Sequence, residues 1–341
     1  MTAPLRLILD RDALVGNWRA LQRLSGRAAC GAAVKADGYG LGATGVVKAL
    51  ANAGCRDFFV ATWAEAEALA PLGVHVSVLH GVRAEDMAIA AALPDARPVL
   101  NTPAQVARWR EGGGGPCDVM VDTGMNRLGL SPDALESVAG LEIDTVLSHL
   151  ASADEDVPSN ARQAAALAAL RGRVPARRFS LANSAGIALG ADYAFDLTRP
   201  GLALYGGVPR ASLSPHIRQV AFPEAQILQR RVLKAGQAIG YNATHIAARD
   251  TEVAIVNLGY ADGYWRGFSG RGVARAGGVA LPVLGRVSMD LTALDVSAAP
   301  ALAEGDWVRF DFQLGEAAAL SGMSPYELLV GLGARFDRVW A

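Results

Sequence analysis

Several features that define large protein classes are scarce in this chain of 341 residues. The three cysteines, Cys30, Cys55 and Cys117, have no Cys-x-x-Cys spacing, which argues against a zinc site and against a disulfide framework. No pair of histidines or carboxylates has the spacing of metal ligands, so we expect no metal. The cysteine pattern also favours a reducing compartment.

Charge and long apolar runs are scarce as well. The formal net charge is −1, which gives no electrostatic reason to bind nucleic acid or an anionic membrane. No stretch approaches the roughly 18 apolar residues of a membrane span. The apolar run at residues 5–9 is too short for a signal peptide. We therefore expect a cytoplasmic protein with neither nucleic-acid nor membrane partners.

Apolar residues, in contrast, make up 51% of the chain, which is ample material for a core. From about residue 28 to 200 short apolar runs alternate with helical patterns, and this predicts a parallel sheet. Eight such runs favour a closed (β/α)8 barrel of the TIM type over an open sheet. We expect its strands near residues 30–35, 57–61, 76–80, 97–100, 118–122, 145–149, 178–182 and 196–199. A helix at 11–24 comes before them.

The pattern of predicted secondary structure changes after about residue 215. Short strand-like runs separated by glycine-bearing turns follow, and only one or two helices are expected, near 315–331. The expected strands lie at 227–232, 238–245, 252–258, 279–283 and 291–296. We therefore predict an α/β protein with the barrel at residues 1–215 and a smaller β-rich domain at 216–341.

Lys35 is the most informative residue, because it ends the first predicted strand in small, apolar surroundings. Burial disfavours the ammonium form, and a neutral amine can form an imine with a carbonyl group. The following residues, 38–43, also fit the Gly-x-Gly-x-x-Gly/Ala turn of dinucleotide-binding proteins. That turn requires an acidic residue at the end of the next strand, but the strand at 57–61 runs into Thr62 and Trp63. This alternative is therefore weaker.

Polar residues lie at or just beyond the ends of five of the predicted barrel strands. They are Lys35, the segment 122–127, Ser148 with His149, Asn183 with Ser184, and the segment 199–201. Taken singly, His149 is explained as a hydrogen-bonded core residue, and Asn183 with Ser184 as a helix cap. A barrel, however, brings all of these strand ends to one mouth.

These side chains suit one ligand in particular. Ser184 at a helix start, with the backbone after Pro200, offers a site for a phosphate. Arg199 has fixed donors that can face a ring nitrogen or a carboxylate. An imine-forming lysine, a phosphate site and a partner for a ring together indicate pyridoxal 5'-phosphate.

Six segments of the chain, in order over nearly its whole length, resemble the alanine racemase family. They are Ala-Val-Lys-Ala-Asp-Gly-Tyr-Gly at 33–40, Val-Asp-Thr-Gly-Met-Asn-Arg-Leu-Gly at 121–129, Arg-Pro-Gly-Leu-Ala-Leu-Tyr-Gly at 199–206, Leu-Gly-Tyr-Ala-Asp-Gly-Tyr at 258–264, Gly-Arg-Val-Ser-Met-Asp at 285–290, and Tyr326 with Glu327. The resemblance implies a pyridoxal-phosphate barrel followed by a β-domain, in a homodimer that acts on alanine.

The resemblance also implies roles for particular residues. Lys35 would hold the cofactor covalently and then act as one base, and Tyr260 of the partner chain would be the base on the opposite face. The phosphate would be held by Tyr39, Ser184, Tyr326 and the backbone around Gly201 and Leu202. Arg199 would face the pyridine nitrogen. Arg127 would lie near the cofactor's phenolic oxygen and the substrate carboxylate, and Met289 would line the substrate site from the partner.

Racemisation itself requires two bases, because a proton leaves one face of Cα and another returns to the opposite face. A free tyrosine has a pKa near 10 and needs cationic or hydrogen-bonding neighbours to serve as a base. The resemblance implies that a chain through His149 and Arg199 supplies them to Tyr260.

Two positions depart from the family pattern. Many relatives have a carbamylated lysine where this chain has Met120, and a histidine where it has Ser180. Without the carbamate, Arg127 loses an anionic partner.

Several alternatives stay open at the level of sequence. They are a racemase that also accepts serine, a decarboxylase of basic amino acids, a non-catalytic pyridoxal-phosphate carrier and a dinucleotide-dependent oxidoreductase. A decarboxylase would have an acidic group at the ring nitrogen where this chain has Arg199, and a carrier would lack residues 215–341. The sequence does not separate a biosynthetic from a catabolic role.

Overall fold

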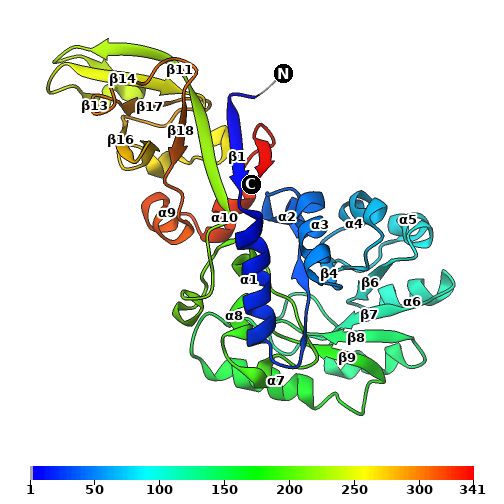
Figure 1. The fold of residues 1–341 in the computed structure, drawn as a ribbon. Helices are drawn as coiled ribbons and strands as arrows, with labels where there is room; N and C mark the ends of the chain where they lie inside the picture. Colours follow the sequence, from blue (N-terminus) through cyan, green and yellow to red (C-terminus); the bar gives the residue numbers. More distant parts are fainter. Residues whose placement is uncertain (1–2) are drawn as a thin grey trace. The chain divides into compact units, whose positions relative to one another are not determined.

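The computed structural model describes residues 3–341, which separate into two compact units. One unit is Asp12–Arg218, and the other is Gln219–Ala341 together with the N-terminal residues through Arg11. Figure 1 shows the helices and strands of both, and we describe each unit by itself.

Parallel strands form the centre of the Asp12–Arg218 unit. In chain order they are β2 (Ala29–Cys30), β3 (Ala32–Ala33), β4 (Phe58–Val60), β5 (Val76–Val78), β6 (Ala96–Leu100), β7 (Cys117–Met120), β8 (Ile143–Leu147), β9 (Ala176–Ser180) and β10 (Leu197–Thr198). Neighbours pair in sequence from β3 to β9, and β10 pairs with β2, which continues into β3.

Backbone hydrogen bonds close this sheet into a ring. The N–H of Arg199 donates to the carbonyl of Ala182 at 2.8 Å, and that of Asp196 donates to Phe179 at 2.9 Å, which joins β10 to β9. With β2 and β3 counted as one interrupted strand, the predicted eight-stranded barrel is confirmed, and boundaries differ from the expected ones by a few residues.

Helices surround the barrel strands. They are α1 (Arg11–Leu24), α2 (Lys35–Tyr39), α3 (Ala43–Ala53), α4 (Trp63–Leu69), α5 (Met87–Ala92), α6 (Pro103–Glu111), α7 (Pro158–Ala168) and α8 (Ser184–Ile187). Figure 1 shows α3 to α6 along the outer side of the strands. Local sequence sets their starts: Thr62 caps α4 in a capping box with Glu65, and Thr102 caps α6 just before Pro103.

Antiparallel strands dominate the other unit. Its main sheet contains β1 (Leu5–Leu9), β11 (Ala221–Leu233), β14 (Thr251–Val256), β15 (Val273–Ala276), β16 (Val279–Leu284), β17 (Thr292–Asp295), β18 (Trp307–Phe310) and β19 (Asp337–Trp340). The order is β14-β17-β16-β15-β18-β11-β1-β19, and β14 also pairs with β11, so part of the sheet closes on itself. Helices α9 (Leu314–Ser321) and α10 (Pro325–Val330) lie in the stretch where helices were expected.

Two details of this unit differ from expectation. The first domain was expected to begin at residue 1, but β1 pairs antiparallel with β11 and parallel with β19, so its hydrogen bonds place it in the β-rich unit. The single strand expected at 238–245 is a hairpin of β12 (Ala238–Ile239) and β13 (His245–Ile246). Between them Asn242 and Ala243 have positive φ, which ends any extended run.

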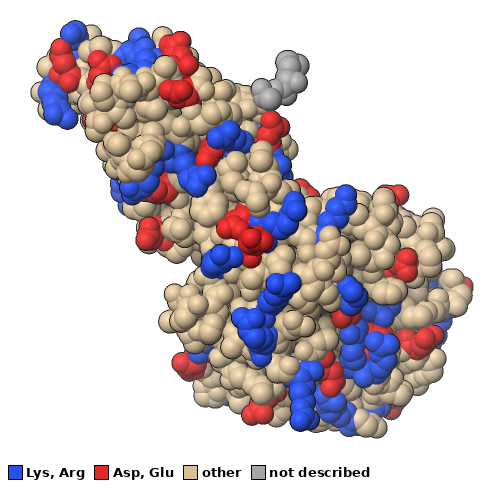
Figure 2. Space-filling model, viewed as in Figure 1, with Lys and Arg blue, Asp and Glu red and all other residues tan. Residues whose placement is uncertain are grey.

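Surface charge is mixed on both units. Figure 2 shows lysine and arginine side chains interspersed with aspartate and glutamate on the visible face of each unit. None of the helices within residues 3–341 is long and apolar enough to cross a membrane.

Candidate active site

Lys35 lies directly after the first barrel strand, at the start of the short helix α2. The segment is held in an unusual backbone conformation, since Ala36, Asp37 and Tyr39 all have positive φ of 52–56°. Side chains brace it from both ends. A carboxylate oxygen of Glu65 accepts from the Ala36 N–H at 2.7 Å, and Asp37 accepts from the N–H of Ala43 at 2.8 Å. A strained conformation that is braced in this way is typical of a functional segment.

The charge of Lys35 is weakened by its surroundings. Burial lowers the pKa of its ammonium group, and the nearby positive charges of Arg127 and Arg199 lower it further, while Glu65 opposes them. The neutral amine, which is the nucleophilic form, is therefore easier to reach than in a surface lysine.

Arg199 follows the last barrel strand and is buried, with 6% of its surface exposed. Its guanidinium donates to the hydroxyl of Ser180 and, at 2.6 Å, to the carbonyl of Ser148. It also lies over the ring of Phe59, with 5.8 Å between Cζ and the centroid. Burial lowers its pKa to about 10, against the influence of Asp118. Both acceptors are neutral, so the positive charge is not cancelled by direct contact.

His149 follows the sixth strand and stays uncharged. Burial lowers its pKa to about 3, and the charges of Arg199, Arg127 and Lys35 add to the effect. These four side chains are thus close enough to act on one another's charge. The expectation that a barrel gathers the strand ends is met for this group.

Ser184 forms a second part of the barrel mouth together with the turn after Pro200. Its hydroxyl oxygen accepts from the N–H groups of Gly201 at 3.0 Å and Ala203 at 3.1 Å. Tyr39 packs against the same turn, because a Cβ on Gly201 would lie only 2.1 Å from its hydroxyl oxygen. The Tyr39 ring also stacks on that of Tyr205, with centroids 4.7 Å apart. Leu202, which follows Gly201, is buried.

Arg127 belongs to the loop after the fifth strand. Asp122 organises this loop by accepting from the N–H groups of residues 124, 125 and 126 at 2.8–3.1 Å. No carboxylate forms an ion pair with the Arg127 side chain in the part of the chain that the structure describes. Met120, where the resemblance led us to expect a lysine, packs in a buried apolar cluster with Phe59, Val99 and Leu147.

Tyr260 lies in the β-rich unit, on a tight turn against the segment that contains Met289. The N–H of Tyr260 donates to the carbonyl of Ser288 at 3.0 Å, and that of Ala261 donates to Met289 at 3.0 Å. A Cβ on Gly259 would lie 2.2 Å from the carbonyl oxygen of Met289, so only glycine permits this approach. Tyr260 and Met289 are therefore neighbours, and the Met289 side chain is 54% exposed.

An arginine far along the sequence joins these two segments. Arg335 forms two hydrogen bonds to the fully buried carboxylate of Asp262, at 2.6 and 2.8 Å, and another to Asp290 at 2.7 Å. Asp262 in turn accepts from the N–H of Gly259 at 3.0 Å. Sequence reasoning missed Arg335, because nothing near it in the chain signals a partner 73 residues away. Tyr326, the remaining expected residue, lies in the first turn of α10 and is 44% exposed.

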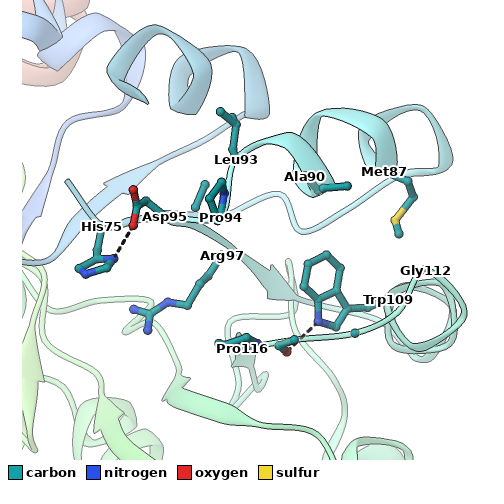
Figure 3. Close-up of a pocket in the computed structure, with 14 residues that line it drawn as sticks. His75, Met87, Ala90, Leu93, Pro94, Asp95, Arg97, Trp109, Gly112 and Pro116 are labelled. Carbon is teal, nitrogen blue, oxygen red and sulfur yellow. Dashed lines mark hydrogen bonds and ion pairs between the residues drawn. The ribbon is translucent and has the colours of Figure 1, made fainter. Parts of the chain in front are cut away.

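One groove in the barrel unit lies away from all of these residues. It has a volume of about 360 Å³. Figure 3 shows Met87, Arg97 and Trp109 among the residues that line it. Part of its lining lies at the start of β6 and just before β7, where barrel strands begin, and the rest includes residues of α5 and α6. Barrel chemistry takes place at the opposite ends of the strands, so we assign the groove no part in the candidate site.

Comparison with known proteins identifies the family. The model for the alanine racemase N-terminal domain matches residues 9–209, and the model for the C-terminal domain matches residues 220–340. The chain belongs to the alanine racemase family. The resemblance in the sequence motifs is thereby confirmed.

Individual relatives agree with this assignment. The alanine racemase of Acidiphilium cryptum is 42% identical over 351 residues, which cover 98% of each chain. Two proteins of Agrobacterium fabrum, named biosynthetic and catabolic alanine racemase, are both 41% identical and cover 98% and 97% of this chain and 93% and 91% of their own. The crystal structure of alanine racemase from Bartonella henselae with covalently bound pyridoxal phosphate is 34% identical, with a TM-score of 0.88 and 99% coverage of both chains.

Proposed function

We propose that this protein interconverts L-alanine and D-alanine with bound pyridoxal 5'-phosphate, using Lys35 and Tyr260 as bases on opposite faces of the substrate. The observation that carries the proposal is Lys35 itself, a braced strand-end lysine whose pKa is lowered by burial and by Arg127 and Arg199. The names of the relatives support alanine as the substrate. The Bartonella henselae structure, which has covalently bound pyridoxal phosphate, supports the choice of cofactor.

The barrel mouth suits a phosphate. Arg127 and Arg199 are cationic, and neighbouring His149 is neutral, so the site favours an anion. The Ser184 oxygen already accepts two backbone N–H groups, which leaves its own O–H to donate to a phosphate oxygen. Tyr39 and the backbone at Gly201 and Leu202 would complete the contacts within this unit.

The pyridine ring would lie against Arg199. A guanidinium has five N–H donors, and the two acceptors Ser180 and Ser148 use only part of them. Arg199 can therefore donate to the ring nitrogen while it keeps its own proton, which leaves that nitrogen unprotonated. When bound, pyridoxal phosphate supplies an aldehyde for covalent attachment and a conjugated ring that withdraws electrons from the substrate Cα. An unprotonated ring withdraws them less strongly, which limits side reactions.

Each of the two proposed bases, Lys35 and Tyr260, would transfer a proton on one face of the substrate Cα. Lys35, once substrate has taken its place, can hold or release a proton at Nζ on one face of Cα. Tyr260 of the partner chain would do the same at its phenolic oxygen on the other face. Arg127, whose side chain has no ion pair within residues 3–341, would bind the substrate carboxylate. Met289 of the partner would line the pocket for the substrate side chain, and Tyr326 would contact the phosphate.

Substrate breadth beyond alanine is an independent question. Serine differs from alanine by one hydroxyl group, and an apolar pocket rejects such an addition poorly. We propose alanine as the main substrate and treat an alanine/serine racemase as the second candidate. Chiral chromatography of the products from a panel of L-amino acids separates the two. The 41% identity to both a biosynthetic and a catabolic relative leaves the physiological role open.

Covalent mapping tests the proposal most directly. Borohydride reduction of the purified enzyme, followed by peptide mass mapping, should place a pyridoxyl adduct on Lys35, because that amine is most easily neutral. The chain has two other lysines, Lys48 and Lys234, which serve as internal controls. An adduct on either of them, with Lys35 unmodified, would contradict the assignment.

A further inference from the structure

Arg266 lies over the aromatic face of Tyr260. Its guanidinium carbon is 5.1 Å from the centroid of the ring, within the range of a cation–π interaction. We infer that Arg266 is a positioning residue for the reaction, which holds the Tyr260 side chain in the orientation from which it transfers a proton. This inference rests on the proposed function, in which Tyr260 is one of the two bases.

The backbone of Arg266 is anchored on both sides by buried aromatic residues. Tyr264 and Phe268 are each about 1% exposed or less, and their rings stack at 4.3 Å with an angle of 5° between planes. Tyr264 also meets Phe310 edge-on at 4.7 Å, and its N–H donates to the carbonyl of Gly259 at 3.1 Å. The start of the Tyr260 turn and the backbone next to Arg266 are thus held to one core, which keeps the backbones that carry the two side chains close together.

The positive charge of Arg266 is not paired with a negative side chain within residues 3–341. No carboxylate there forms an ion pair with it, whereas Arg335 pairs with Asp262 and Arg275 pairs with Asp311. The ring of Tyr260 is therefore its main partner. Restricting the ring to one orientation reduces the loss of entropy on reaching the reactive geometry.

Substitution of Arg266 by methionine keeps much of the side-chain length and removes the charge. We expect Arg266→Met to lower kcat/KM for alanine by about twofold to fivefold, the factor that corresponds to an exposed cation–π contact. Arg266→Lys should retain more activity, because the ammonium group also interacts with the ring. Arg249→Met is the matched control: Arg249 is exposed and separated from Tyr260 by the whole of strand β14, and this variant should match the unmodified enzyme.

A lower kcat/KM for Arg266→Met does not by itself show whether proton transfer at Tyr260 or at Lys35 is impaired. Enantiomers have equal free energies, so any variant lowers kcat/KM equally in both directions. The hydrogen isotope effect does distinguish the bases, because only one enantiomer presents its α-hydrogen to Tyr260. With α-deuterated substrates, Arg266→Met should widen the difference between the isotope effects of the two enantiomers. Equal changes for both, or no loss of activity relative to Arg249→Met, would overturn the inference.

A Tyr260→Phe background separates this inference from the proposed function. That variant should lose racemisation but still exchange the α-hydrogen of one enantiomer with deuterium oxide through Lys35. Adding Arg266→Met should leave this exchange unchanged, because the ring hydroxyl it positions is already absent. A further loss of exchange would refute a role through Tyr260. If Tyr260→Phe racemises normally, the assignment of the base fails, whatever Arg266→Met does.

Discussion

Arg199 is the side chain for which we propose contact with the cofactor ring. It is buried, its partners Ser180 and Ser148 offer only neutral oxygens, and burial lowers its pKa to about 10. An arginine with that pKa is still protonated at neutral pH. Its charge adds to the effect of burial, which is the main reason that the pKa of His149 is lowered to about 3.

Replacement of Arg199 by glutamate tests this role. A carboxyl group at the same place would let the pyridine nitrogen bind a proton, so the ring would withdraw electrons more strongly. We expect slower racemisation and a new long-wavelength absorbance when substrate is added. Circular dichroism should first establish that Arg199→Glu folds. A folded variant with unchanged rate and spectrum would mean that Arg199 does not face the ring.

At the scale of residues, the sequence predicts those whose chemistry is tied to a local motif. Lys35 is recognisable because it ends an apolar run and precedes a glycine turn. The partners of Arg199 are harder to predict from the sequence. Ser180 and Ser148 come from the ends of two other strands, and Ser148 accepts through its backbone carbonyl group. The Ser180 hydroxyl also donates to the carbonyl of Leu197 at 2.5 Å. The hydroxyl therefore serves as the acceptor for Arg199.

At the scale of elements, the sequence predicted the strands that coincide with buried apolar runs, but it did not predict several short strands of the β-rich unit. Most barrel strands coincide with apolar runs, because parallel strands are covered on both faces, whereas β9 contains Arg177 and Arg178. The strand β15, with the sequence Val-Ala-Arg-Ala, has neither a long run nor a clear alternation, and its position depends on pairing with β16 and β18. The sequence analysis therefore did not predict β15. It also missed β18 and β19, which are equally short at four residues each. The strand β1 was assigned to the wrong unit because its partners lie more than 200 residues away.

Arg335 offers a test of the element that positions Tyr260. Arg335→Gln would leave the fully buried carboxylate of Asp262 without its cation, which typically costs about 3–5 kcal/mol. We expect a clear fall in Tm, measured by calorimetry, and a loss of activity as the Tyr260 turn loosens. Arg275→Gln is the control, because its pair with Asp311 is exposed and worth about 0–1 kcal/mol. Equal stability of the two variants would refute a structural role for the Asp262 pair.

At the scale of the whole molecule, the chain divides the candidate chemistry between two units. Lys35 and the phosphate site belong to the barrel unit, and Tyr260, Met289 and Tyr326 belong to the β-rich unit. Periodicity and composition predicted both architectures, because each unit buries its own core. No local pattern states which chain supplies which base, because assembly depends on surfaces and not on the period of a strand. The homodimer with shared sites is thus a proposal, drawn from the family resemblance.

Subunit exchange tests whether the site is shared between two chains. Lys35→Ala and Tyr260→Ala homodimers should each be nearly inactive, since each lacks one base. After mixing and random exchange of equal amounts, about half of the dimers are mixed, and each mixed dimer has one doubly altered site and one intact site. Roughly a quarter of the unmodified activity should therefore return. Native mass spectrometry should verify the exchange. If mixed dimers form and activity stays at the level of the single variants, both bases come from one chain and the shared site is wrong.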